Sequence, residues 1–115
     1  MSLDIVIVNW NSGLFLDNCL NSLNKYGLNQ INKVVIIDNA SSDESFKSIN
    51  TYRFKMQVIE NNHNIGFGAA CNQGAKLCSS PFVLFLNPDT ENFEKSLEIP
   101  LIFIKDKSNL NIGVP

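Results

Sequence analysis

Four short, mostly apolar runs divide the chain, and each of them ends at a polar residue. Continuous runs of this length are typical of strands that are buried on both faces, as in a parallel sheet covered by helices. The third run is weaker, because apolar and polar residues alternate in it. The runs predict strands over Leu3 to Val8, Val34 to Ile37, Met56 to Ile59 and Val83 to Leu86.

The segments between these runs carry the signals of helices. The capping box Ser41-Ser42-Asp43-Glu44 predicts a short helix toward Ile49, with Ser41 and Asp43 as capping residues. Small and apolar residues over 67–77 predict a helix packed tightly on the sheet. After the first strand, apolar residues recur at helical spacing between candidate N-caps and a glycine stop: Asn11 and Ser12, then Leu14, Leu16, Cys19, Leu20 and Leu23, then Gly27.

The last part of the chain continues the alternation. Residues 91–107 predict a further helix, in which Pro100 must lie near the start or cause a break. Ile112-Gly113-Val114 predicts the opening of a fifth strand. Alternating strands and helices indicate right-handed crossovers and an α/β fold with an open, doubly wound, mainly parallel sheet. The chain stops as the fifth strand begins, so we expect a truncated domain.

Composition indicates one modest globular domain. The chain has 115 residues, of which 44% are hydrophobic and 17% charged. A net charge of −2 and the lack of a basic run argue against a nucleic-acid partner. The three cysteines form no C-x-x-C motif, which indicates reduced, buried or half-buried thiols in a cytoplasmic protein. These residues encode neither a signal peptide nor a transmembrane run.

Polar residues follow all four predicted strands. In an open α/β sheet, ligands bind outside the carboxyl ends of the strands, where these residues meet. Asn, Asp, Ser and Gly also serve turns and helix caps, which explains most single strand ends. Asp38 and Asp89 are harder to explain as caps, because each closes a well-formed apolar strand at the same edge of the sheet.

The two carboxylates suggest different roles in a ligand site. One can accept hydrogen bonds from a ribose or a base, and the other can help to bind a hard cation such as Mg²⁺ or Mn²⁺. Between them, the glycines of Asn64-Ile65-Gly66-Phe67-Gly68 allow a ligand to approach the backbone and open a helix whose N-terminus favours anions. Together these features predict a pocket for a nucleoside diphosphate.

The motifs resemble the N-terminal, nucleotide-binding portion of family 2 glycosyltransferases, which have the Rossmann-like GT-A fold. The most similar branch is the bacterial, rhamnosyltransferase-like one. The resemblance implies a single nucleotide-sugar-binding portion over 1–115, without the acceptor-binding half. Four pieces match in order and spacing across nearly the whole chain: Ile5 to Gly13, Val34 to Asp43, Asn62 to Gly74 and Leu84 to Thr90.

The resemblance implies roles for the strand ends. Asn9 would line the base pocket with its backbone, and Asp38 would contact the base or ribose. Asn64 and Gly66 would lie in the loop next to the nucleoside and the diphosphate. The complete set of implied nucleotide-sugar-binding residues is Val8, Asn9, Asp38, Asn39, Asn64, Gly66, Asn87 and Asp89.

Two positions depart from the family pattern. Asn87-Pro88-Asp89 is similar to the D-x-D motif, with Asp89 binding the Mg²⁺ or Mn²⁺ cofactor, but Asn87 replaces the first acid. Cys71 stands where many relatives carry an arginine before the asparagine. Both departures are usual for the N-P-D-T branch, so they are expected to change substrate choice more than function.

The implied reaction transfers a sugar from a dTDP- or UDP-sugar, with dTDP-rhamnose as a candidate, to an acceptor hydroxyl with inversion. The implied setting is cell-surface polysaccharide synthesis in the cytoplasm or at the inner face of the membrane, with a glycan or lipid-linked acceptor. No catalytic base is found here, so it is expected beyond Pro115, and the chain alone is expected to bind the donor without transfer. Its unfinished sheet edge also predicts self-association.

Two other classes of protein fit parts of the pattern. Gly66 to Cys71, with Asp89 about 20 residues on, is similar to the dinucleotide-binding fingerprint, but it follows the third strand and ends in cysteine. A receiver-like signalling domain would use Asp38 as phosphoacceptor, but it needs acidic residues after the first strand. Asn9, Trp10 and Asn11 stand there instead. Trp10 is expected to be a packing residue or a pocket wall, and His63 is expected to be exposed in its Asn-rich loop.

Overall fold

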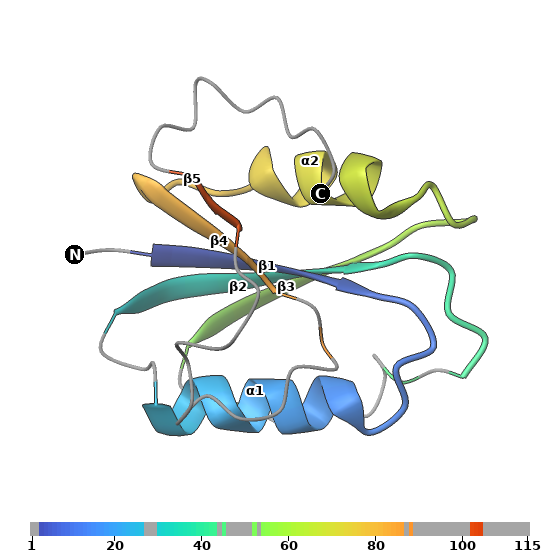
Figure 1. Ribbon diagram of the computed structural model, residues 1–115, viewed down its shortest axis with the longest axis horizontal. Helices are drawn as coiled ribbons and strands as arrows, with labels where there is room; N and C mark the ends of the chain where they lie inside the picture. Colours follow the sequence, from blue (N-terminus) through green and yellow to red (C-terminus); the bar gives the residue numbers. More distant parts are fainter. Residues whose placement is uncertain are drawn as a thin grey trace.

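A computed structural model describes residues 3–26, 30–43, 45, 52, 54–86, 88 and 102–104. They form a five-stranded sheet with the strand order β3-β2-β1-β4-β5 (Figure 1). The prediction of an open, mainly parallel α/β sheet is confirmed. β1 (Leu3–Asn9), β2 (Ile31–Asp38), β3 (Lys55–Glu60) and β4 (Phe82–Leu86) are parallel, and β5 (Ile102–Ile104) pairs antiparallel with β4.

Two helices cover opposite faces of the sheet, α1 (Phe15–Tyr26) on one and α2 (Phe67–Ala75) on the other (Figure 1). Side chains of β1 point alternately to the two helices, as the pleat of a strand requires. Ile5 and Ile7 lie in the hydrophobic cluster that includes α1, whereas Val6 and Val8 lie in the cluster that includes α2. This two-sided burial explains why the strands are continuous apolar runs in the sequence.

The first three strands end level with one another. The register pairs Asn9 with Asp38, and Asp38 with Glu60. The loops that follow β1, β2 and β3 therefore start from one rim of the sheet, which is where an open α/β fold binds its ligands.

Helix α2 lies very close to β1, in agreement with the small residues that predicted tight packing. A Cβ atom added at Gly74 would lie 2.5 Å from Cγ1 of Val6 and 3.2 Å from Cγ1 of Ile37. Carbon atoms in a packed interior do not approach so closely. Glycine at position 74 therefore sets the distance between the helix and the sheet.

At the opposite end of the strands, a buried carboxylate near the start of β1 bonds to three other residues. Asp4 Oδ2 accepts hydrogen bonds from the backbone N–H groups of Ser79 and Ser80, at 2.7 and 2.9 Å. Asp4 Oδ1 accepts from Ser80 Oγ and Asn32 Nδ2, each at 2.9 Å. Burial raises the pKa of Asp4, but these hydrogen bonds outweigh it, so that the pKa lies below its usual value.

The three cysteines are buried and form no disulfide, in agreement with the reduced, buried or half-buried thiols that were predicted. Cys71 lies in α2 within the cluster against the sheet. Burial raises the pKa of its thiol to about 12.

The prediction of one helix over 91–107 is wrong at residues 102–104, which form β5. Ile102-Phe103-Ile104 is β-branched and aromatic, as strands prefer, and it pairs with an edge of β4 that the local sequence does not reveal. The strand predicted at 112–114 and most of the helix predicted toward Ile49 lie outside the described residues. Within the described part, neither helix is long and apolar enough to cross a membrane.

Candidate functional site

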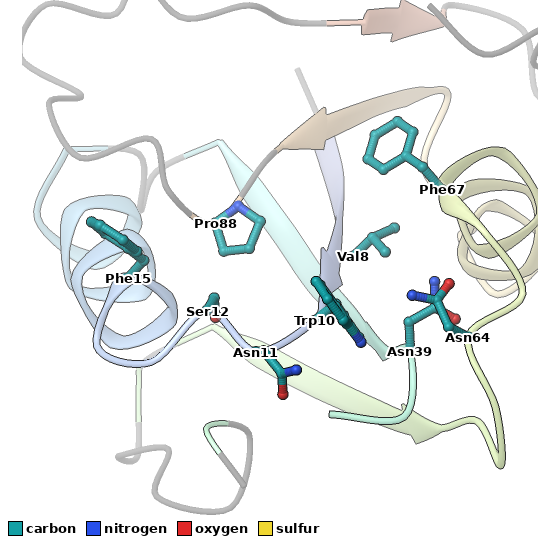
Figure 2. Close-up of a pocket in the computed structure, with 9 residues that line it drawn as sticks. All are labelled: Val8, Trp10, Asn11, Ser12, Phe15, Asn39, Asn64, Phe67 and Pro88. Atoms are coloured by element: carbon teal, nitrogen blue, oxygen red, sulfur yellow. The ribbon is translucent and has the colours of Figure 1, made fainter. Parts of the chain in front are cut away.

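A cavity of about 390 Å³ opens at the rim where β1 and β2 end. Its walls come from the end of β1, the loop into α1, the residues after β2, the start of α2 and Pro88 after β4 (Figure 2). None of the lining side chains that the structure describes carries a charge. The lining residues are Val8, Trp10, Asn11, Ser12, Phe15, Asn39, Asn64, Phe67 and Pro88.

Three aromatic side chains in this lining remain open to solvent. Trp10 is 56% exposed, Phe15 43% and Phe67 37%. Figure 2 shows Trp10 between Val8 and Asn11, with Phe67 on the first turn of α2. Large apolar rings gathered at one exposed hollow mark a surface that a ligand can cover.

Behind the aromatic wall, Asn9 and Asp38 form a buried polar pair. Asn9 Nδ2 donates to Asp38 Oδ1 at 2.8 Å and to Ser45 Oγ at 2.9 Å. The hydroxyl of Ser12 donates to Asn9 Oδ1. Asp38 Oδ1 also accepts from Ser41 Oγ at 2.6 Å, and its Oδ2 accepts from the Ser41 N–H at 3.1 Å. The two strand ends are thus joined by side chains as well as by the sheet.

Asn11 joins the loop after β1 to the loop after β2. Its Oδ1 accepts from the N–H groups of Ser42 and Asp43, at 2.7 and 3.2 Å. Its own N–H donates to Ser41 Oγ at 3.0 Å. Asn11 has a φ of 47° and Ala40 a φ of 66°, which is left-handed backbone that costs about 1–2 kcal/mol at an alanine. Such strain is retained where surrounding contacts hold the loop in one shape.

Asp43 strengthens this junction from the surface. Its Oδ1 accepts from the Ser45 N–H at 3.0 Å, and its Oδ2 accepts from the Gly13 N–H at 2.9 Å. The hydrogen bond from the Ser45 N–H lowers the pKa of Asp43 most. Desolvation opposes it, but further hydrogen bonds from the Ser45 side chain and the Gly13 N–H keep the pKa below its usual value. The capping role predicted for Asp43 thus extends to a second loop.

Carboxamides connect the other side of the cavity to α2. Asn39 Nδ2 donates to the Gly66 carbonyl at 3.2 Å, and Asn39 Oδ1 accepts from the Ile65 N–H and Asn61 Nδ2, each at 3.2 Å. Asn61 and Gln73 exchange two amide hydrogen bonds, at 2.9 and 2.8 Å. The loop 61–66 is therefore fixed against both β2 and α2.

The loop into α2 ends in a left-handed glycine. Gly66 has a φ of 87°, and its N–H donates to Asn64 Oδ1 at 2.8 Å. As the N-cap of α2, Gly66 contributes no side-chain hydrogen bond to the helix, and the first turn holds no acidic residue. The N–H groups at the start of α2 are consequently available to an anion.

The structure brings together most of the residues that the sequence selected. Val8, Asn39 and Asn64 line the cavity, whereas Asn9, Asp38 and Gly66 lie directly behind its lining. Asn87 and Asp89 lie outside the described residues, although Pro88 between them is buried and lines the cavity. Their roles in binding stay predictions.

Sequence reasoning left Trp10 undecided and did not select Phe15 or Phe67. Trp10 belongs to the cavity wall, and His63 is exposed as expected. A usable signal was present, because aromatic residues directly after a strand end or beside a glycine loop are out of place in an ordinary polar turn. Among the described residues, no group of three or more His, Cys, Asp or Glu side chains could hold a metal ion.

The chain matches known glycosyltransferases in sequence. The family model described as Glycosyl transferase family 2 matches residues 4–114. A poly(ribitol-phosphate) beta-glucosyltransferase of Bacillus spizizenii is 32% identical over 130 aligned positions, covering 100% of this chain and 20% of that protein. The poly(ribitol-phosphate) beta-N-acetylglucosaminyltransferase TarS of Staphylococcus aureus is 27% identical over 111 aligned positions, covering 92% of this chain and 19% of that protein. The chain thus spans about a fifth of the length of these curated relatives.

Solved structures agree with the sequence matches. The crystal structure of S. aureus TarS 1–349 superposes with a TM-score of 0.68 at 25% identity, over 84% of this chain and 31% of that one. The mannosyltransferase PcManGT from Pyrobaculum calidifontis, solved with GDP-Man and Mn²⁺, has the same TM-score of 0.68 at 16% identity, over 76% of this chain and 27% of that one. The second likeness concerns the fold alone, and the GT-A fold is confirmed.

The family match also decides among the three classes that the sequence left open. A dinucleotide-binding domain and a receiver domain each explained only one motif, whereas the match over residues 4–114 includes all five strands of the described sheet except Leu3. The chain belongs to the family 2 glycosyltransferases.

Proposed function

We propose that the cavity binds the nucleoside diphosphate of a sugar donor, in a protein that transfers the sugar to an acceptor hydroxyl. One observation carries this proposal. A hollow with exposed aromatic walls, whose described lining carries no charge, lies at the carboxyl ends of β1 and β2, beside the open N-terminus of α2. Such a hollow suits a flat base at one end and an anion at the other.

The base is the part of the ligand that the aromatic walls favour. Trp10 and Phe67 offer rings on which a base can stack. Asn11 and Asn64 offer amide donors, because Nδ2 of each has no partner among the described residues, whereas Oδ1 of each already accepts from the backbone. Such donors suit the carbonyl oxygens of a pyrimidine, which agrees with a dTDP- or UDP-linked donor.

The diphosphate would lie toward α2. The positive end of a helix dipole and free N–H groups favour phosphate oxygens, and Phe67 places the first turn of α2 at the cavity. The left-handed Gly66 allows the backbone to turn into the helix without a side chain in the way.

A divalent cation, Mg²⁺ or Mn²⁺, is part of this proposal. The described lining supplies no carboxylate, so the protein's contribution would be Asp89, directly after the cavity residue Pro88. A single acid fits a cation that keeps most of its shell from substrate phosphates and water. Its chemistry would be to neutralise the charge that develops on the leaving diphosphate.

The relatives suggest which sugars to test first. They are named for transfer of glucose and N-acetylglucosamine to poly(ribitol-phosphate), so these sugars stand beside the rhamnose that the sequence suggested. The acceptor would be a hydroxyl of a cell-surface polymer or its lipid-linked precursor, handled in the cytoplasm at the inner face of the membrane. Self-association of the chain also stays a prediction.

Transfer would proceed by direct displacement with inversion. That step needs a base on the acceptor hydroxyl, typically worth about 10²–10⁴-fold in rate, which we place outside this chain. Within the chain, the cavity and the loops behind it would bind and orient the donor, which supplies a further part of the rate effect.

The experiment is a binding panel of UDP, dTDP, GDP and NAD, measured by calorimetry with Mn²⁺ and with a chelator. We expect UDP or dTDP to bind, with an affinity that falls on chelation and in Asp89→Ala. Leu14→Ala is the matched control, because Leu14 is 77% exposed at the same rim but does not line the cavity. Preference for NAD, or binding indifferent to metal and to Asp89, would contradict the proposal.

A further inference from the structure

Asp38 is buried on the far side of the cavity wall. Its side chain is 1% exposed and does not line the cavity, although its neighbour Asn39 does. The pleat of β2 explains the difference. Val34 and Ile36 pack toward α1, whereas Val35 and Ile37 pack toward α2, so Asp38 follows the α1 side.

We infer that Asp38 is a positioning residue, which holds the loop that carries Trp10 and does not touch the ligand. The inference rests on the proposed nucleotide site for what Trp10 binds, but the hydrogen bonds that support it are independent of any ligand.

The carboxylate of Asp38 is already engaged. Its Oδ1 accepts from Asn9 Nδ2 at 2.8 Å and from Ser41 Oγ at 2.6 Å, and its Oδ2 accepts from the Ser41 N–H at 3.1 Å. Three of roughly four acceptor positions of a carboxylate are thus filled by protein groups. One position on Oδ2 stays open, but the side chain is 1% exposed and does not line the cavity, so a ligand in the cavity does not reach it without moving the wall.

The same bonds run to both sides of Trp10. On one side, Asn9 donates to Asp38 directly. On the other side, the N–H of Asn11 donates at 3.0 Å to the hydroxyl of Ser41, which itself donates to Asp38. Trp10 is therefore the single residue between Asn9, whose side chain bonds to the carboxylate, and Asn11, whose backbone is tied to the same carboxylate through Ser41.

The charge of Asp38 orients this arrangement. Because the Ser41 hydroxyl donates its hydrogen bond to the carboxylate, its lone pairs are left to accept from the N–H of Asn11. A carboxamide at position 38 would place its NH₂ group, which is a donor, in one of two orientations. It would face either the donors Asn9 Nδ2 and Ser41 Oγ or the donor Ser41 N–H, so at least one hydrogen bond would be lost. The loop would then lose its fixed position while the stacking surface of Trp10 itself is retained.

Fluorescence of Trp10 tests the positioning role without a ligand, because it is the only tryptophan in the sequence. We expect Asp38→Asn and the milder Ser41→Ala to lower its anisotropy and to raise its rate of quenching by acrylamide. Asp4→Asn is the matched control. Asp4 is an equally buried carboxylate that accepts four hydrogen bonds from protein groups, and it lies at the opposite end of the strands.

Nucleotide analogues separate positioning from direct contact. We expect Asp38→Asn to weaken UDP or dTDP binding about tenfold or more. Removing the ring N–H by 3-methylation, or a ribose hydroxyl by deoxygenation, should cost the same factor in wild type and in Asp38→Asn, since no contact links them. If Asp38 accepted a ligand hydrogen bond, one of these analogues would lose affinity in wild type alone.

Each outcome has one meaning. A folded Asp38→Asn or Ser41→Ala protein with the anisotropy and quenching of wild type overturns the positioning role, as does an analogue effect confined to wild type. If Asp38→Asn does not fold, Ser41→Ala decides, because it keeps the charge and removes only the hydroxyl bridge. If wild type binds no nucleoside diphosphate, the proposed function fails while the fluorescence comparison still decides the inference.

Discussion

Asn9 and Asp38 end two neighbouring parallel strands in register, and Asn9 Nδ2 donates to Asp38 Oδ1 at 2.8 Å. Both side chains are buried at the rim where the cavity opens. A buried amide and carboxylate that bond to one another and to the same serine-rich loop hold their strands in one arrangement, because separating them breaks a hydrogen bond that water cannot readily replace. The rim of this domain is therefore rigid at its base and open at its aromatic wall.

The aromatic wall leads to the first prediction, which rests on the proposed function. Trp10→Ala is expected to weaken binding of the preferred nucleoside diphosphate by about 1–3 kcal/mol, the usual contribution of one stacked base. Calorimetry measures the loss. Leu14→Ala, at the exposed rim outside the cavity, should leave the affinity unchanged. Equal losses in both variants would mean that the rim as a whole, and not Trp10, was disturbed.

The second prediction concerns the contact between α2 and β1. Gly74→Ala is expected to lower the free energy of unfolding by about 1–3 kcal/mol, because the new methyl group would lie 2.5 Å from Val6 Cγ1. Urea denaturation measures the change. Adding Val6→Ala opens space at the contact, so the double variant should lose less than the sum of the two single losses. Additive losses would show that the helix simply moves away from the sheet.

The third prediction is a loss of stability in acid that depends on Asp4. The pKa of Asp4 is lowered in the folded protein, so its contribution is complete above the unfolded pKa of about 3.9 and is lost as the pH falls through the folded pKa. Urea unfolding between pH 7 and pH 2.5 should show this decline in wild type. In Asp4→Asn the stability should be lower at neutral pH, and the decline smaller. An unchanged slope would assign the acid sensitivity to other carboxylates.

The fourth prediction concerns the thiols. At pH 8 a thiol with a pKa of about 12 is almost entirely protonated, and Cys71 is also buried, so it should react very slowly with a disulfide reagent in the folded protein. The other two cysteines are buried as well. All three thiols of the sequence should be titrated after unfolding in guanidinium. Rapid native labelling of Cys71, located by peptide mapping, would show that α2 opens from the sheet.

Much of the fold could be predicted from local patterns. The strands around Ile5, Val35 and Leu84 are continuous apolar runs because helices cover both faces of the sheet, and α1 has its apolar residues at helical spacing. β5 could not be predicted in this way. Its three residues become a strand by pairing with β4, and such pairing depends on a distant edge that a local window does not contain.

The same distinction between local patterns and long-range contacts applies to the site. The sequence by itself determined that Asn, Asp, Gly and aromatic residues follow the strands, because strand ends and turns are recognised from short local sequence motifs. Only the tertiary structure decided which of them face the cavity. Asp38 and Asn39 are adjacent in the chain, yet one is buried behind the wall and the other lines it. Register, pleat and contacts across some thirty residues, such as that of Asn11 with Asp43, made that choice, and these depend on how the whole sheet packs.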